Sequence, residues 1–431
     1  MQENPRKVST PSNSIDYWIG VYPQGRIMYN RFWYNFFDAG EHMKSLKVQS
    51  FILISIGFIL GMSEFIIVGI INNLADSFHV GISNVGFLVT MFAIFYALVT
   101  PILTILVGEH RLKRVMLLLL SIFTISNIMT AVANSFLILS LSRVLNAVVA
   151  GITVSIAITF AAVIAPRDKR AWLISWVFSG YSVASVFGVP IGTWISDQIG
   201  WRWAFWLIVL ISVVITGMFM VSLPGNLRQG KAKSLGEQFS LFKDPRILLG
   251  ICLPILNLGG VYVVYTYLRP IVTSGLHFPT SFVTPFLFVF GLASLFSNQY
   301  SGRLANRDGL KSMVTVFVIQ AVTMLAISLL FGLPWSALAA LIIMGLTMYL
   351  LNSPMQIFYL AVAEKDYPQS MVLASSLISI FNNVGIAVGS ATGGVLFNHL
   401  GLKSLGYSGA IYTVVALVLL IVLNRVRRRF D

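Results

Sequence analysis

The 431-residue sequence contains one cysteine, Cys252, and only 10% of its residues are charged. A lone cysteine excludes an intramolecular disulfide and the CxxC patterns of redox and zinc sites. No P-loop, HExxH or GxSxG motif and no carboxylate pair occurs in the loops, which are too short for a soluble catalytic domain. We therefore expect no enzyme, no metal and no cofactor, so any active process would draw its energy from a gradient.

What the chain has in abundance is apolar sequence. Hydrophobic residues make up 57% of it and its mean hydropathy is +0.84, values that a water-soluble globule does not reach. A hydrocarbon core of about 30 Å needs about 20 apolar residues per helix. Twelve stretches satisfy this and predict an all-α, multi-pass membrane protein: 48–71, 84–107, 114–133, 136–160, 172–195, 203–223, 247–270, 281–300, 312–332, 336–361, 371–397 and 406–424.

The sequence also repeats itself. Residues 188–200 read GVPIGTWISDQIG and residues 389–401 read GSATGGVLFNHLG, with three framing glycines in one register. Upstream, residues 105–114 (ILVGEHRLKR) are a degenerate counterpart of residues 302–311 (GRLANRDGLK). Two motifs in the same order predict two equivalent halves. The predicted organisation is a tail (1–47), a six-helix bundle (48–223), a basic linker (224–246), a second six-helix bundle (247–424) and a basic tail (425–431).

The distribution of basic residues predicts the orientation. Of the 29 Lys and Arg residues, only Arg202, Arg269 and Lys403 fall in loops on one side, and Arg143 lies within a span. All others fall on the opposite side, which places both termini in the cytoplasm by the positive-inside rule. The net charge of +14 therefore indicates contact with anionic lipid of a cell inner membrane, and not nucleic-acid binding. We expect a monomer from a bacterium.

Residues 1–47 lack the apolar segment and cleavage site of a signal peptide. One interpretation is a disordered cytoplasmic tail. The alternative hypothesis is that translation starts at Met43, because Gly40-Glu41 can be encoded by a purine-rich stretch where a bacterial ribosome-binding site would lie. Mass spectrometry of the native N-terminus separates the two, since a peptide from residues 1–42 would exclude the later start.

One carboxylate lies well inside a predicted span. Of the 15 acidic residues, all except Glu64 fall in tails, loops or helix ends. Burial of an unpaired charge in the membrane costs several kcal/mol, so a carboxylate at that position is a candidate functional group. Glu64 in the first span and Arg143 in the fourth each lie at a depth of about 10 Å from the same membrane face, at 1.5 Å per residue. The sequence therefore predicts that both charges lie at one level.

The second-half loop resembles the signature loop of the major facilitator superfamily, in its twelve-helix drug:proton antiporter branch. The resemblance covers roughly residues 48–424. It implies a role in locking helix ends together at the cytoplasmic face for Gly302, Arg303, Arg307, Asp308, Gly309 and Lys311. The first-half copy keeps Glu109, Lys113 and Arg114 but lacks both glycines and has His110 at a usually basic position. We therefore expect the second-half loop to contribute more to the gate.

Other segments resemble the same branch. Asn134-Ser135-Phe136, Leu139 and Arg143 resemble the start of its fourth helix, and Gly188, Pro190 and Gly192 resemble the fifth-helix motif of its antiporters. The alternative for this motif is simple helix packing, since small residues commonly bring membrane helices together. Three further segments, 61–65, 200–206 and 381–389, are most similar to bacterial arabinose, sugar and purine-nucleoside efflux permeases. That subgroup is too diverse to indicate a substrate.

The resemblance implies that the first and fourth helices line a central cavity. Glu64 and Arg143 would then pair when the site is empty, and changes in their environment would bind and release a proton. The alternative is a static ion pair that fixes helix packing. Uncharged polar residues predicted to line the cavity are Tyr96, Asn146, Tyr181, Asn257, Tyr262, Tyr265, Asn352, Gln356, Asn382 and Asn383. Each of them has the alternative of an interhelical hydrogen bond or an interfacial anchor.

Together these features predict a proton-coupled antiporter that exports a small neutral or weakly polar molecule, or a drug, by alternating access. An uptake symporter or uniporter is the first alternative, because the same fold supports both directions. A membrane sensor or assembly protein that transports nothing is the alternative from another class, although the sequence has no soluble output domain.

Overall fold

A computed structural model describes residues 29–107, 110–166, 170–225, 239–305 and 309–427. It divides the chain into two units, Met1–Ser45 and Leu46–Asp431. Helix α1 runs over Tyr29–Phe78, and its apolar segment Leu46–Phe78 belongs to the second unit. The predicted tail is therefore helical from Tyr29 onward. All further description concerns the second unit, in which the described residues are helical or lie in short turns.

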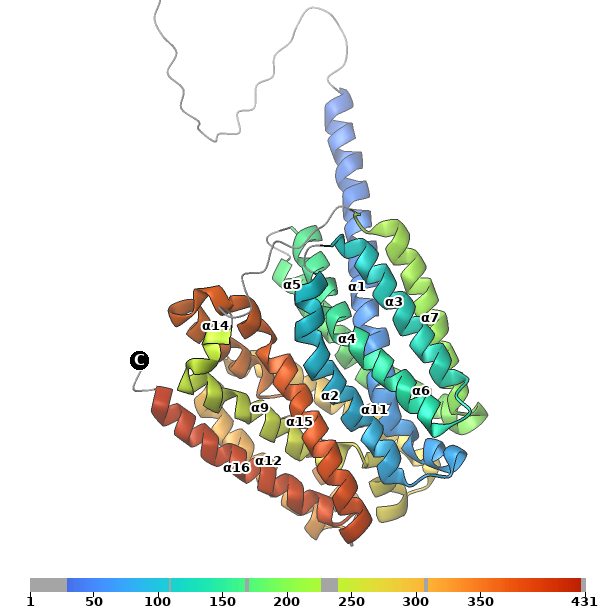
Figure 1. Ribbon diagram of the computed structural model, residues 1–431, viewed down its shortest axis with the longest axis vertical. Helices are drawn as coiled ribbons and strands as arrows, with labels where there is room; N and C mark the ends of the chain where they lie inside the picture. The colour runs from blue at the N-terminus through green and yellow to red at the C-terminus, as the bar shows by residue number, and fades with distance from the viewer. Residues whose placement is uncertain (1–28, 108–109, 167–169, 226–238, 306–308, 428–431) are drawn as a thin grey trace, which may run out of the picture. The chain divides into compact units, whose positions relative to one another are not determined.

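Both halves of this unit consist of long apolar helices (Figure 1). In the first half α1 is followed by α2 (Ile82–Val107), α3 (Leu112–Ala131), α4 (Phe136–Ile164), α5 (Arg170–Val183), a π-helical turn η1 (Ala184–Gly188), α6 (Val189–Ile199) and α7 (Trp201–Ser222). The second half contains η2 (Phe239–Lys243), α9 (Pro245–Tyr265), α10 (Leu268–Pro270), η3 (Ile271–Gly275), η4 (Thr280–Phe282), α11 (Val283–Ala305), α12 (Gly309–Leu329), α13 (Pro334–Thr347), α14 (Asn352–Asp366), η5 (Pro368–Ser370), α15 (Met371–Leu400) and α16 (Ser404–Arg427).

The predicted all-α membrane fold is confirmed. Among the described residues, 11 helical segments are long and apolar enough to cross a membrane. The predicted span 172–195 is the exception, because it is divided into α5, η1 and α6. Pro190 lacks a backbone N–H and cannot bond to the preceding turn, and the π-helical turn lies directly before α6, whose first turn contains Pro190. The three pieces follow one another without a gap and together provide the remaining crossing.

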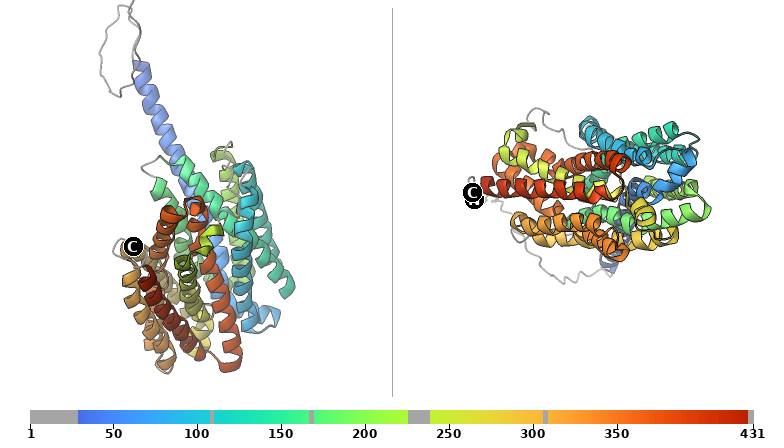
Figure 2. Two further views of the ribbon diagram at one scale, coloured as in Figure 1. Left: turned by 60° about the vertical axis from the view of Figure 1, so that its left-hand side comes forward. Right: turned by 90° about the horizontal axis from the view of Figure 1, so that it is seen from below.

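The two halves meet along two helix pairs. α2 of the first half packs against α15 of the second, and α11 of the second half packs against η1, α5 and α6 of the first. Figure 2, seen from below, shows the orange α11 and α12 region beside the green helices of the first half. Within the second half, α15 also packs closely against α9. α15 therefore contacts both halves, so groups on its faces can line the space between them.

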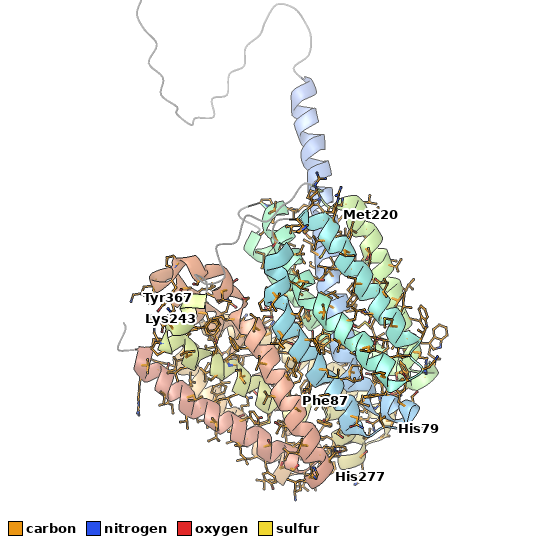
Figure 3. The ribbon with its side chains drawn as sticks, in the orientation of Figure 1. His79, Phe87, Met220, Lys243, His277 and Tyr367 are labelled. Carbon is orange, nitrogen blue, oxygen red and sulfur yellow. The ribbon has the colours of Figure 1, made fainter. Side chains whose placement is uncertain are left out.

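Two histidines mark one end of the unit. His79 follows α1 and His277 follows η3, and both have positive φ angles of 52° and 58°. This left-handed conformation is a common way to end a helix, and here it recurs at matching points of the two halves. Figure 3 shows both histidines at one end and Lys243 and Tyr367 at the other. We call these the His79 end and the Lys243 end.

Two glycines of the repeated motif, Gly192 and Gly389, lie where helices approach closely. A Cβ atom on Gly192 of α6 would stand 2.4 Å from Ile66 Cδ1 of α1, and one on Gly389 of α15 would stand 2.1 Å from the Gly259 carbonyl oxygen of α9. Both distances are below van der Waals contact. The Ile66 side chain can move aside, whereas the Gly259 backbone cannot, so the approach at Gly389 in particular requires a residue without Cβ. The motif therefore packs the corresponding helix of each half against the first helix of that half.

Gly389→Ala is expected to destabilise the second half. Its methyl group would meet a backbone carbonyl, which cannot rotate away, and overpacking of this kind costs at least about 1–3 kcal/mol. The matched control is Gly217→Ala on α7, where no atom lies within 4 Å of the added Cβ. Thermal unfolding of the purified protein in detergent measures both. A midpoint for Gly389→Ala equal to that of Gly217→Ala would contradict the close approach of α9 and α15.

Candidate transport site between the two halves

Glu64 lines a small cavity that residues of both halves enclose. From the first half come Phe65, Ile67, Val68, Leu88, Val89, Phe92 and Arg143, and from the second half Tyr262 and Ile386. Its free volume is about 10 Å³, which holds about one water molecule. The walls are mainly apolar. Binding of a larger molecule would therefore require the halves to move apart.

Arg143 is held beside this cavity by α1. It is 1% exposed, and its Nη2 atom donates to the Ser63 carbonyl oxygen at 2.8 Å while Nη1 donates to Ser63 Oγ at 3.2 Å. Its guanidinium carbon also lies 5.2 Å from the centre of the Phe92 ring, within the range of a cation–π contact. These contacts depend on the planar shape of the guanidinium as well as on its positive charge.

The expected ion pair between Glu64 and Arg143 is not formed. Within the described residues no ion pair or hydrogen bond involves Glu64, although Arg143 is near enough to attract it electrostatically. The guanidinium is directed to Ser63 instead, and its Nε atom is buried without a hydrogen-bond partner. Both charges line one cavity, as predicted, but the structure holds them apart.

A polar network that sequence analysis missed surrounds Ser63. Ser63 Oγ donates to Asn127 Oδ1 at 2.8 Å and accepts from Asn146 Nδ2 at 3.1 Å, and Asn146 also donates to Ser126 Oγ at 3.1 Å. Polar groups buried in a membrane must be satisfied internally, so this network fixes the α1–α3–α4 packing that positions Arg143. The signal was present as polar residues in the middle of the third predicted span.

Tyrosines from both halves lie around Glu64. Five of them interact electrostatically with it: Tyr96, Tyr181, Tyr262, Tyr265 and Tyr349. Four were predicted cavity residues, and Tyr349 was missed. Among the described groups, the hydroxyl of Tyr181 is buried without a hydrogen-bond partner, whereas that of Tyr262 interacts with Tyr349. A buried polar group without a partner is costly, so the Tyr181 hydroxyl is a candidate group for solute binding.

Four of the predicted amides form hydrogen bonds within the second half. Asn382 Nδ2 donates to Asn352 Oδ1 at 3.2 Å, and Asn257 Nδ2 donates to the Met348 carbonyl at 3.0 Å. Asn383 donates to the Ser379 carbonyl, and it lies one helical turn from the cavity residue Ile386 on α15. Their Oδ1 atoms, except that of Asn352, are buried and unpaired.

The remaining amide, Gln356, is half-buried on α14. No contact among the described residues brings it to the Glu64 cavity. Asn382 and Asn383 lie on α15, the helix that contacts both halves and contributes Ile386 to the cavity.

A larger cavity opens toward the Lys243 end. Its free volume is about 840 Å³, and it lies between α5 and α11, the facing helices of the two halves. The lining residues are Trp176, Ser179, Val183, Leu295, Phe296, Ser297, Gln299, Tyr300, Arg303, Leu346 and Leu350. Free volume thus remains beside the contact of the two halves near this end, whereas little remains around Glu64.

The signature-loop residues are described only in part. Glu109, Arg307 and Asp308 lie outside the described residues. Lys113 Nζ donates to the Leu223 carbonyl at 2.6 Å, which joins α3 to the end of α7 within the first half. A Cβ on Gly309 would be 2.9 Å from Pro354 Cβ, whereas one on Gly302 would meet nothing within 4 Å. Arg114, Arg303 and Lys311 are exposed.

Charged groups enclosed between two repeat-related helical bundles are typical of multi-pass membrane transporters. The family model of the Major Facilitator Superfamily matches residues 53–372. The chain belongs to this superfamily. It is 34% identical to the uncharacterized MFS-type transporter YtbD of Bacillus subtilis, over 84% of this chain and 91% of that one.

Two further similarities agree with the assignment. The chain is 27% identical to the "Probable sugar efflux transporter" of Pasteurella multocida, over 90% of this chain and 94% of that one. Among solved structures it resembles the D-xylose-proton symporter with a TM-score of 0.71 and 15% identity, covering 87% of this chain and 97% of the other. The structural likeness confirms the all-α transporter fold.

Proposed function

We propose that this transporter is a proton-coupled antiporter that exports a small neutral or weakly polar molecule by alternating access. The observation that carries the proposal is Glu64, a carboxylate inside a membrane span that lines a cavity shared by both halves. Among the described residues it has neither an ion-pair nor a hydrogen-bond partner. An intramembrane carboxylate without a fixed partner is suited to bind and release a proton as its surroundings change.

The proposed direction is export. Support comes from the fifth-helix motif, in which Gly188 and Gly192 of the η1–α6 segment pack against Met62 and Ile66 of α1. The name of the Pasteurella relative supports efflux as well. In the proposed orientation the Lys243 end faces the cytoplasm, in agreement with the distribution of basic residues. A monomer in the inner membrane is the proposed transporting unit.

The proposed substrate class follows from the polar groups that remain unpaired. Around Glu64 they include the hydroxyl of Tyr181, and on α15 they include Oδ1 of Asn383. Such groups bind uncharged hydrogen-bonding solutes, while the surrounding Phe, Ile and Val side chains contact apolar parts. The two charges that line the cavity, Glu64 and Arg143, are of opposite sign, so the lining carries no net charge that would favour a strongly charged substrate.

Transport into inverted membrane vesicles tests the proposal. A panel of radiolabelled sugars, nucleosides and lipophilic drugs would be offered to vesicles whose lumen is acidified. We expect at least one compound to accumulate and to alkalinise the lumen, because outward transport in the cell becomes inward transport here. Accumulation only in right-side-out vesicles would indicate an uptake symporter. Transport of no compound in either vesicle, with folded protein present, would favour a membrane protein that moves no solute.

A further inference from the structure

Arg269 connects the two halves at the His79 end. It lies on α10 of the second half and is 3% exposed. Its Nη2 atom contacts Asp197 Oδ1 on α6 at 2.7 Å, and its Nη1 atom donates to the Gly69 carbonyl oxygen on α1. One side chain of the second half therefore binds two helices of the first. A guanidinium is suited to this because its donors point in separate, fixed directions.

The two helices that Arg269 binds are already joined to each other. Asn73 Nδ2 of α1 donates to Asp197 Oδ1 of α6 at 3.1 Å. A Cβ on Gly69 would lie 2.0 Å from Thr193 Oγ1, so the two helices touch at this level. α1 and α6 thus form one rigid surface within the first half. Arg269 contacts both of these helices from the second half, and this contact can open when the halves separate.

A second set of contacts crosses between the halves at the same end. Ser83 Oγ, at the start of α2, donates to Asn398 Oδ1, near the end of α15, at 2.8 Å. The Tyr267 ring fills the space over Gly86, where a Cβ would lie 2.3 Å from Tyr267 Oη. The His79 end is therefore closed by side chains, in contrast to the 840 Å³ cavity toward the Lys243 end.

We propose that Arg269 and Asp197 form the gate that closes the His79 end and that this pair breaks whenever that end opens. The pair is nearly buried when closed, with side-chain exposures of 4% and 19%. Removal of one partner leaves the other charge buried without compensation, which is strongly unfavourable. When the halves separate, water hydrates both charges, so the contact is reversible. By contrast, the ion pairs of Arg246 with Asp244 and Asp366 lie within the second half and do not cross.

The rate of cross-linking between positions 83 and 398 measures how often the His79 end is closed. Ser83→Cys and Asn398→Cys, in a Cys252→Ser background, would be joined by a short bifunctional thiol reagent in detergent. Asp197→Asn and Arg269→Gln are each expected to slow cross-linking at least about fivefold, a usual lower range for conformational coupling. The double variant should add little to either single variant, because both remove one interaction.

Arg202→Gln is the matched control. This arginine lies at the same end, yet its Nη2 atom donates to the Ala133 carbonyl at 2.9 Å and its guanidinium stacks on Trp201, both within the first half. It should leave cross-linking unchanged. An unchanged rate in both gate variants, additive effects in the double variant, or an equal effect of Arg202→Gln would overturn the proposal.

Thiol labelling inside the cavity is a second test of the gate that does not rely on the cross-linked cysteine pair. Val68→Cys, in the cavity wall, should react faster with a water-soluble thiol reagent once the gate is broken, and equal reactivity would overturn the gate. If one variant does not purify as a monodisperse protein, the other partner's variant decides. Both assays need no substrate, gradient or membrane orientation. Their failure is therefore distinct from failure of the proposed antiport.

Discussion

Glu64→Gln is expected to abolish gradient-driven transport while passive exchange of the substrate continues. The glutamine has nearly the same volume and polarity but cannot gain or lose a proton, so the cavity keeps its shape and loses its titrating group. Without a coupled proton, a pH gradient does no work on the substrate. Proteoliposomes with an imposed pH gradient measure the first effect, and counterflow of labelled substrate without a gradient measures the second.

The matched control is Asp76→Asn, an exposed carboxyl near the end of the same helix. It should transport normally. Glu64→Asp keeps a titratable group and should keep partial coupling. Full accumulation by Glu64→Gln would mean that another group carries the proton, and loss of both accumulation and counterflow would indicate a binding or structural role instead.

Much of the fold follows from the sequence because membrane helices obey one simple requirement. Each must supply about 20 apolar residues and satisfy its own backbone hydrogen bonds, so their number is visible without tertiary information. The break at Ala184–Gly188 was less visible. Pro190 signals a disturbed helix, but whether it becomes a kink or a π-helical turn depends on the packing against α1. Helix ends are set by local geometry, as at His79, and apolar runs locate them only roughly.

The site was predictable in its charges and less so in its contacts. A carboxylate inside a span is rare enough to make Glu64 a candidate from composition alone, and the structure places it in the cavity wall. The partner of Arg143 was not predictable, because the nearest acceptor is a backbone carbonyl and hydroxyl of Ser63, the neighbour of Glu64 in sequence. Tyr349 was missed because it lies in the turn between α13 and α14, where the sequence shows only an uninterrupted span.

Arg143→Lys is expected to impair transport by about tenfold or more, even though the charge is retained. The guanidinium donates to two different oxygens of Ser63 and lies against Phe92, whereas an ammonium is a compact point charge without a planar fork. Each hydrogen bond from a charged donor contributes about 1.5–3 kcal/mol, and about 1.4 kcal/mol corresponds to a tenfold change in rate. Loss of one of the two bonds therefore suffices for the expected effect.

Ser63→Ala separates the geometry from the charge. The substitution removes Ser63 Oγ, which accepts from Arg143 Nη1 at 3.2 Å, but keeps the Ser63 carbonyl oxygen, which accepts from Arg143 Nη2 at 2.8 Å. Its effect on the transport rate should therefore be smaller than that of Arg143→Lys. Initial transport rates in proteoliposomes, with thermal unfolding of each purified variant, distinguish a transport defect from misfolding.

Because an untethered charge near Glu64 would also favour the direct ion pair that the structure lacks, the lysine variant should respond weakly to the pH gradient. Near-normal rates for the lysine variant would mean that positive charge alone meets the requirement at this position and that its attachment to Ser63 serves only helix packing.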